Sequence, residues 1–216
     1  MAAMWLDAIY GPDVPPELEV RRRHEDRWSD VCRLAHSGLS SPVTSSAGRL
    51  FDAVSALCGI RDVIRYEGQA AIELEQRADM GETGSYPLPV EDLGTGAAFR
   101  LRARDLVWAA AEDLRTGAPA ETVATRFHRG LAAGVVSACR TVRDARGLST
   151  VACSGGVFQN GLFLGLVVDG LEAEGFRVLV HSRVPPNDGG ISLGQAACAG
   201  ARDRNGELHE ATCVLR

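Results

Sequence analysis

Residues 148–190 decide the fold, and they read LSTVACSGGVFQNGLFLGLVVDGLEAEGFRVLVHSRVPPNDGG. A short apolar run over residues 148–153 leads into a Ser-Gly-Gly turn, and a helical pattern follows from Val157 to Glu174. A second apolar run occupies residues 176–180, and another helix is expected after Gly190. Strand, helix, strand and helix in this order predict two parallel strands joined by a crossover helix.

Each predicted strand is followed by a glycine-rich turn, the first over residues 154–156 and the second over residues 187–190. Ligands of open parallel sheets bind outside the carboxyl ends of the strands, where both turns fall. Gly155 and Gly156 let the backbone approach a ligand, and the helix that follows offers N–H groups. The first turn therefore fits a nucleotide or phosphate, although a tight strand-to-helix turn explains the same glycines.

Asp188 lies in the second turn and has two interpretations. An aspartate just before a helix is commonly an N-cap that accepts backbone hydrogen bonds. Its carboxylate could equally hold a divalent cation, but one ligand does not make a metal site. The five histidines show no HxxxH or HExxH spacing that would supply the others.

An amphipathic helix is predicted to begin after Ser45 or Ser46 and to stop at Gly59, because apolar residues recur between them at helical spacing. Asp52 lies near its start. This carboxylate fits the polar face of a capped helix, or it accepts hydrogen bonds from the sugar hydroxyls of a nucleotide.

Further elements surround these motifs. Gly68 precedes a short helix over residues 70–78, and hairpins or loops are expected over residues 80–102. One helix is predicted around residues 106–114, and a long one from Pro119 to Gly147 with a buried apolar stripe.

The composition excludes several kinds of chemistry. The chain has 216 residues, 45% hydrophobic and 24% charged, which is typical of a globular protein of one domain or two small lobes. All 23 basic residues are arginines, so a Walker phosphate loop, a Schiff-base lysine and a pyridoxal enzyme are excluded. The net charge of -5 argues against a nucleic-acid partner, and the run Arg21–Arg23 is expected to form a solvated face.

The six cysteines contain no CxxC pair and no zinc-ligand spacing, so they are interpreted as reduced thiols. Cys153 is expected to be a small buried residue rather than a nucleophile. The longest apolar run, residues 162–168, is far shorter than the ~20 residues that span a bilayer. We therefore expect a cytoplasmic protein without a membrane partner.

Three segments of the chain are distinguished. Residues 1–40 carry prolines and mixed charge, and we expect a loose lead-in with one helix around residues 27–36. Residues 41–205 form the predicted α/β lobe, and residues 206–216 form a tail.

Four stretches resemble the carboxyl-terminal part of HypF, the carbamoyltransferase family of nickel-iron hydrogenase maturation. They are residues 41–54 (SPVTSSAGRLFDAV), 66–71 (YEGQAA), 154–160 (SGGVFQN) and 184–196 (VPPNDGGISLGQA). The same stretches are similar, more distantly, to TsaD, the tRNA threonylcarbamoyltransferase subunit. The resemblance implies one lobe of the actin-like and sugar-kinase-like ATPase fold, which is ribonuclease H-like, with its strands covered by helices.

The resemblance also implies roles for individual residues. Asp52 and Gly68 would contact the ribose of ATP, AMP or carbamoyl adenylate. Gly155, Gly156 and Asn160 would contact the nucleotide around the Gly-Gly turn.

A metal role follows from the resemblance for Asp188, which would be one ligand of an iron or zinc ion. In the family two histidines of an HxxxH motif in a first lobe complete that site, and neither the motif nor that lobe is in this sequence.

The implied reaction transfers a carbamoyl group from carbamoyl adenylate to the carboxyl-terminal cysteine of a HypE-like acceptor protein. The sequence names no catalytic residue. Since the reaction needs both lobes, the expected protein is a split or truncated HypF that works with a companion chain. Two alternatives stay open: a non-catalytic nucleotide-binding remnant, and a transferase that carbamoylates a hydroxyl of a small molecule.

Overall fold

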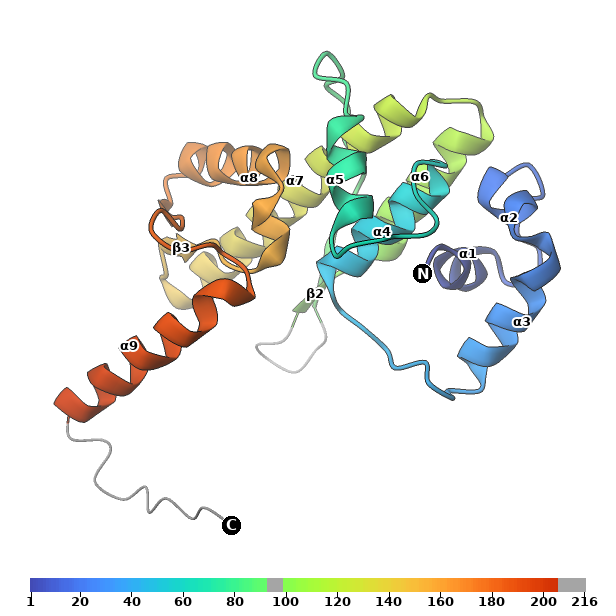
Figure 1. The fold of residues 1–216 in the computed structure, drawn as a ribbon. Helices are drawn as coiled ribbons and strands as arrows, with labels where there is room; N and C mark the ends of the chain where they lie inside the picture. Colours follow the sequence, from blue (N-terminus) through green and yellow to red (C-terminus); the bar gives the residue numbers. More distant parts are fainter. Residues whose placement is uncertain (93–98, 206–216) are drawn as a thin grey trace, which may run out of the picture.

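The computed structural model describes residues 1–92 and 99–205, so the predicted tail, 206–216, lies outside the described residues. Within these ranges a helical body is joined to a smaller carboxyl-terminal α/β unit (Figure 1). The elements are α1 (Ala2–Tyr10), α2 (Glu19–Arg23), α3 (Glu25–His36), α4 (Ala47–Leu57), α5 (Gln69–Gln76), β1 (Val90–Asp92), β2 (Phe99–Leu101), α6 (Ala103–Arg115), α7 (Ala120–Arg146), β3 (Thr150–Ala152), η1 (Gly156–Gln159), α8 (Gly161–Ala173), β4 (Arg177–Leu179), η2 (Asp188–Gly190) and α9 (Ile191–Arg204).

The first forty residues correct the expectation of a loose lead-in, because they form three helices and not one. Helix α1 packs against α4 and α6 and fully buries Leu6. Leu18, Val20 and Trp28 are buried as well. Helix α3 agrees with the predicted helix around residues 27–36, whereas α1 and α2, with 9 and 5 residues, are too short for an apolar period to persist. Packing against the rest of the body stabilises these short helices. The domain boundary at residue 41 stays a prediction.

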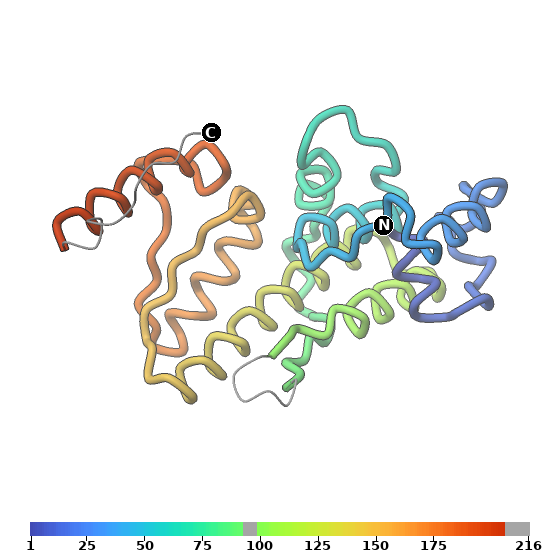
Figure 2. The backbone as a smooth tube through the Cα atoms, turned by 90° about the horizontal axis from the view of Figure 1, so that it is seen from below, coloured from blue at the N-terminus to red at the C-terminus, as the bar shows by residue number. Residues whose placement is uncertain are grey.

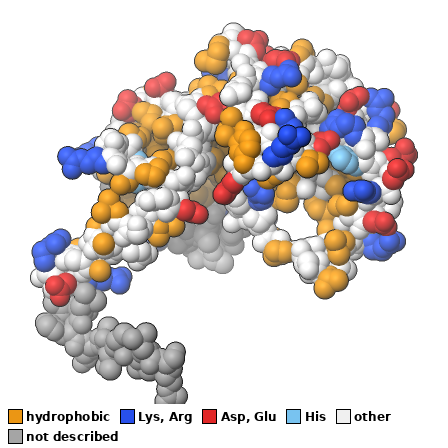
Figure 3. All heavy atoms as spheres, viewed as in Figure 1, with side chains coloured by type: hydrophobic (Ala, Val, Ile, Leu, Met, Phe, Trp, Pro, Cys, Tyr) orange, Lys and Arg blue, Asp and Glu red, His pale blue; other side chains and the backbone are white. Residues whose placement is uncertain are grey.

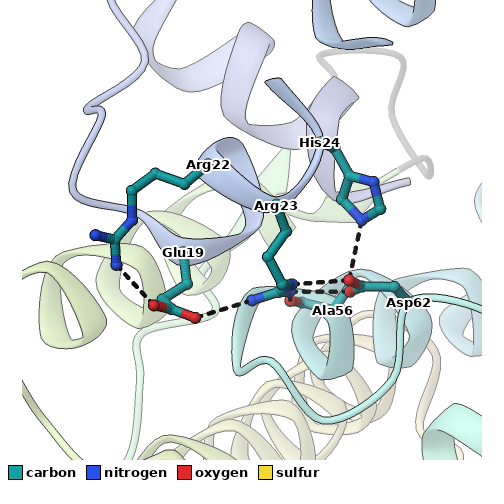
Figure 4. A network of polar contacts seen from close by, with 6 residues as sticks. All are labelled: Glu19, Arg22, Arg23, His24, Ala56 and Asp62. Carbon is teal, nitrogen blue, oxygen red and sulfur yellow. Dashed lines mark hydrogen bonds and ion pairs between the residues drawn. The ribbon is translucent and has the colours of Figure 1, made fainter. Parts of the chain in front are cut away.

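The Arg21–Arg23 run is more than a solvated face, since its third member joins α2 to the end of α4 (Figure 4). The Arg23 guanidinium donates to both carboxylate oxygens of Asp62, at 2.8 and 2.9 Å, and to the carbonyl oxygen of Ala56 at 2.8 Å. His24 Nε2 lies 2.9 Å from the same carboxylate. This network holds the lead-in helices to the body and occupies a carbonyl group near the end of α4.

Helix α7 runs through both parts of the molecule, as Figure 2 shows. It begins directly after Pro119 and ends at Gly147, whose φ of 69° is the left-handed conformation that ends many helices, as the sequence predicted. Its amino-terminal half contacts α5 and α6, and its other half packs along α8. A Cβ at Gly130 would overlap the carbonyl oxygen of Tyr86, so this helix and the chain before β1 pack backbone against backbone.

The α/β unit confirms the predicted order of strand, helix, strand and helix. Strands β3 and β4 are parallel, with Val151 opposite Val178, and α8 is the crossover between them. The predicted helix over residues 157–174 is divided at Asn160 into the 3-10 turn η1 and α8. In the part of the chain that the structure describes, this sheet has two strands.

Helix α9 differs from the other α-helices of the described residues because it has no buried residue, and its main packing partner is η2, next to it in the chain. It projects from the molecule (Figure 1), and hydrophobic side chains lie along it in the space-filling view (Figure 3). Ile191 and Leu193 are 55% and 56% exposed, and Leu179 and Val180 at the end of β4 are also exposed. No helix among residues 1–92 and 99–205 is long and apolar enough to cross a membrane.

The predicted hairpin region contains β1 and β2, which pair antiparallel with Val90 opposite Leu101.

Cys153 is buried as expected, and burial raises the pKa of its thiol.

Candidate functional site

A cavity of about 230 Å³ lies where α4, α5 and η1 meet. Three of the four stretches that carry the family resemblance supply its walls. The lining residues are Gly48, Phe51, Ala71, Ile72, Glu75, Gly156, Val157, Gln159 and Asn160. Segments about 100 residues apart in the sequence therefore meet at one concave site, mostly apolar with a few polar groups, as small-molecule sites commonly are.

Phe51 positions the first turns of α4 at this cavity. Its side chain is fully buried, and its ring packs edge-to-face on Phe127, with ring centroids 4.9 Å apart. It also meets Phe163 of α8 at 6.0 Å and His128 of α7 at 5.3 Å. These contacts hold the helix that follows the Gly-Gly turn against α4.

Asp52 follows Phe51 but does not line the cavity. Its side chain is 16% exposed and forms an ion pair with Arg49 at 2.8 Å. Burial raises the pKa of the Asp52 carboxyl, and the neighbouring Arg49 opposes this shift. Asp52 is thus the neighbour in sequence of a residue that lines the cavity, and its carboxylate lies outside the cavity lining.

Gly68 occupies the position before α5 and has a φ of 79°, in the region that favours glycine. A Cβ there would meet no atom within 4 Å among the described residues, so the backbone conformation and not crowding requires this glycine. It lies three residues before Ala71, the first residue of α5 that lines the cavity.

The Gly-Gly turn follows β3, as predicted, and contacts the second glycine-rich loop. Gly155 has a φ of 107°, and its N–H donates to the carbonyl oxygen of Pro186 at 2.7 Å. His181 Nε2 lies 3.0 Å from Ser154 Oγ. The backbone N–H of Gly155 is therefore already bonded within the protein, while Gly156 reaches the cavity wall.

Asn160 is 7% exposed, and both ends of its side-chain amide are hydrogen bonded. The amide oxygen accepts from the backbone N–H of Phe163 at 2.7 Å, which makes Asn160 the N-cap of α8. The amide nitrogen lies 3.0 Å from His128 Nε2. Asn160 thus shapes the cavity through a structural role that the sequence did not indicate.

Asp188 is exposed and begins η2, whereas its neighbour Asn187 is the cap, with its side-chain oxygen accepting from the N–H of Gly189 at 3.1 Å. The Asp188 carboxylate has no hydrogen bond or ion pair with any described residue. Over residues 1–92 and 99–205 no group of three or more His, Cys, Asp or Glu side chains could hold a metal. One carboxylate does not make a metal site, so the described residues by themselves do not fit a metal ion.

Two further residues at the site were not predicted from the sequence. Glu75 of α5 lines the cavity, and its carboxylate accepts from the backbone N–H of Leu162 at 3.0 Å. His128 of α7 lies behind Asn160 and is fully buried, and this burial lowers the pKa of its imidazole. The sequence offered only a weak sign of His128, a polar residue directly after Phe127 in the apolar stripe of a long helix.

The comparisons with known proteins agree with this architecture. A family model described as "Carbamoyltransferase, Kae1-like Domain, second subdomain" matches residues 1–195. Carbamoyltransferase HypF of Rhodobacter capsulatus is 36% identical over 176 residues, which are 80% of this chain and 22% of that protein. Its counterpart in Rhizobium leguminosarum bv. viciae is 40% identical over 164 residues, 74% of this chain and 20% of that protein.

Two solved structures have the same fold. A crystal structure of full-length HypF in the phosphate- and nucleotide-bound form matches with a TM-score of 0.78 at 30% identity, covering 92% of this chain and 26% of that one. The structure of T. kodakarensis HypF matches with a TM-score of 0.76 at 26% identity, covering 94% of this chain and 27% of that one. The chain spans roughly a quarter of these proteins, and it belongs to the HypF carbamoyltransferase family, in which it corresponds to the second subdomain of the Kae1-like domain.

Proposed function

We propose that this chain forms the nucleotide-binding half of a HypF-type carbamoyl transfer site that acts in nickel-iron hydrogenase maturation. The observation that carries the proposal is the cavity between α4, α5 and η1, because the stretches that resemble the family converge there. The proposed nucleotide is ATP, AMP or carbamoyl adenylate. Asp52 and Gly68 would contact its ribose, and Gly155, Gly156 and Asn160 would surround it from the Gly-Gly turn.

In the proposed reaction a cysteine thiolate at the carboxyl terminus of a HypE-like acceptor attacks the carbamoyl carbon of carbamoyl adenylate. A carbon–sulfur bond forms, the bond from that carbon to the phosphate oxygen breaks, and AMP leaves with the electron pair. The thiol proton is released before attack. We assign no catalytic residue to this chain.

A companion chain completes the proposed site. Asp188 would supply one carboxylate to an iron or zinc ion, and two histidines of an HxxxH motif in the companion would supply the other protein ligands. The exposed Asp188 carboxylate, which lacks a partner among the described residues, supports this sharing. The exposed apolar side chains of β4 and α9 support a second surface that packs on this unit.

The ribose assignment is tested by titrating AMP into the wild-type chain and into Asp52→Ala by calorimetry. Asp169→Ala, which removes an exposed carboxylate of α8, is the matched control. We expect Asp52→Ala to weaken AMP binding about tenfold or more, as expected for losing a hydrogen bond to a charged group, and the control to leave it unchanged. Equal affinities of the wild type and Asp52→Ala would refute the ribose role.

The metal assignment needs the reconstituted enzyme, so the second test adds a companion lobe that carries the HxxxH motif. Asp188→Ala is expected to abolish metal binding by the complex while the isolated chain keeps its fold. Unfolding of Asp188→Ala would instead identify a structural role for this residue. Carbamoyl transfer to a small-molecule hydroxyl by the isolated chain would favour the small-molecule transferase.

A further inference from the structure

A chain of hydrogen bonds connects the buried face of α7 with Asn160, which lines the cavity. We propose that His128 is a positioning residue, which holds the side chain of Asn160 and thereby the turn over residues 155–160 in the geometry that the nucleotide needs. The inference rests on the proposed function for its ligand, but the geometry that carries it involves only residues of this chain.

The hydrogen bonds fix the protonation state and orientation of both side chains. His128 Nδ1 lies 2.7 Å from the carbonyl oxygen of Ala124, which can only accept, so Nδ1 carries the hydrogen. In the neutral ring Nε2 then carries the lone pair and accepts from the Asn160 amide nitrogen at 3.0 Å. The Asn160 amide oxygen faces the N–H of Phe163, so a flipped amide would lose both bonds.

The Gly-Gly turn depends on Asn160 through the backbone as well. The N–H of Asn160 donates to the carbonyl oxygen of Val157 at 3.2 Å, and that of Phe158 donates to Gly155 at 3.1 Å. From the cavity side, the Glu75 carboxylate accepts from the N–H of Leu162. The first turn of α8 is therefore held by two side chains from two other helices, α5 and α7.

A buried polar side chain is costly unless it is paired, and among the described residues Asn160 is the only side chain that shares a hydrogen bond with His128. Replacing the imidazole by an apolar group leaves the Asn160 amide nitrogen buried without an acceptor. The expected consequence is local, because Asn160 must move to find a partner and the turn that it caps moves with it.

The test compares three variants. His128→Leu fills the space and removes the acceptor, whereas His128→Gln keeps an oxygen acceptor for Asn160. Thr125→Val is the control: its hydroxyl donates to the carbonyl oxygens of Asp79 and Glu121, so the change removes buried hydrogen bonds one turn away on the same helix. The measurements are amide hydrogen exchange of residues 155–163 without ligand, and the affinity for AMP by calorimetry.

We expect His128→Leu to speed exchange across residues 155–163 and to weaken AMP binding, each about tenfold, which corresponds to the loss of one buried hydrogen bond. His128→Gln is expected to restore both readouts to within about threefold of the wild type. Thr125→Val is expected to lower the midpoint of denaturation without a selective change in either readout.

Unchanged exchange in His128→Leu would overturn the inference, and so would a loss that the Gln variant does not restore. Equal changes in the Thr125→Val control would overturn it as well, because they would show a general loss of stability. If the wild-type chain binds no AMP, the proposed function fails, while the exchange comparison still decides whether His128 positions the turn.

Discussion

The helical body and the carboxyl-terminal α/β unit are joined by one helix, but they differ in how completely they are packed. In the body Leu106, Val107 and Phe127 are fully buried, and most residues of α7 between Val123 and Gly134 are buried as well. In the α/β unit the parallel strands have three residues each, and α9 buries no side chain. Parallel sheets normally have both faces covered, so we expect the short β3–β4 sheet and α9 to pack on a further surface that the described residues do not supply.

The largest test of this difference removes one apolar side chain from each part. Phe127→Ala deletes a fully buried ring and is expected to cost about 3–5 kcal/mol of unfolding free energy. Leu193→Ala, on the exposed side of α9, is expected to change it by less than about 0.5 kcal/mol. Urea denaturation followed by circular dichroism measures both. A cost above about 2 kcal/mol for Leu193→Ala would show that α9 packs in the isolated chain.

Two glycine-to-alanine substitutions, one in each part, are expected to change the stability of the protein in opposite directions. Gly130→Ala places a Cβ against the backbone of Tyr86 in the body and is expected to destabilise the protein by about 1–3 kcal/mol. Gly165→Ala, in α8, meets no described atom within 4 Å and is expected to stabilise it by about 0.5–1 kcal/mol through helix propensity. Thermal denaturation of the two variants measures both changes in stability. A stabilising Gly130→Ala would refute the close approach of α7 to residue 86.

The smallest effect concerns the attachment of the lead-in helices to the body. Arg23→Ala removes the partner of Asp62 and is expected to cost about 1 kcal/mol at pH 7, since both side chains are less than a third exposed. Arg27→Ala, on the neighbouring helix, has no ion pair among the described residues and serves as the control.

The same variant has a predicted pH dependence. Burial would raise the pKa of the Asp62 carboxyl, but hydrogen bonds from Arg23 and His24 hold it below its ordinary value. A lowered pKa in the folded state gives stability that is complete above the unfolded value of about 3.8 and is lost as the pH falls through the folded value. The difference between the wild type and Arg23→Ala should therefore shrink below about pH 4. A difference that grows on acidification would contradict this assignment.

The sequence predicted the parts of the fold that follow from local signals. The alternation of apolar runs and glycine turns after residue 148 predicted the β3–α8–β4 unit, and the glycine at position 147 predicted the end of α7. Of the lead-in helices, α3 was predicted around residues 27–36, whereas α1 and α2 were missed, because they are held by contacts with distant residues such as Asp62. Local propensity carries no sign of such contacts.

The candidate site was predicted only in part for the same reason. The resemblance drew attention to the Gly-Gly turn and to the α4 stretch, and the structure places Gly156 and Phe51 in one cavity. The amide of Asn160 caps α8 and donates to His128, and Glu75 accepts from the N–H of Leu162. These contacts follow from the way α5, α7 and α8 meet. The spacing of residues in the sequence does not indicate how these three helices pack together.

We propose that this chain forms half of a nucleotide site, and calorimetry on a cavity-filling variant tests that proposal. AMP is titrated by calorimetry into the wild type and into Ala71→Phe, which fills the cavity from α5. We expect saturable binding to the wild type and its loss in a folded Ala71→Phe. Binding that is equal in both proteins, or no binding to a cooperatively folded wild type, would contradict it.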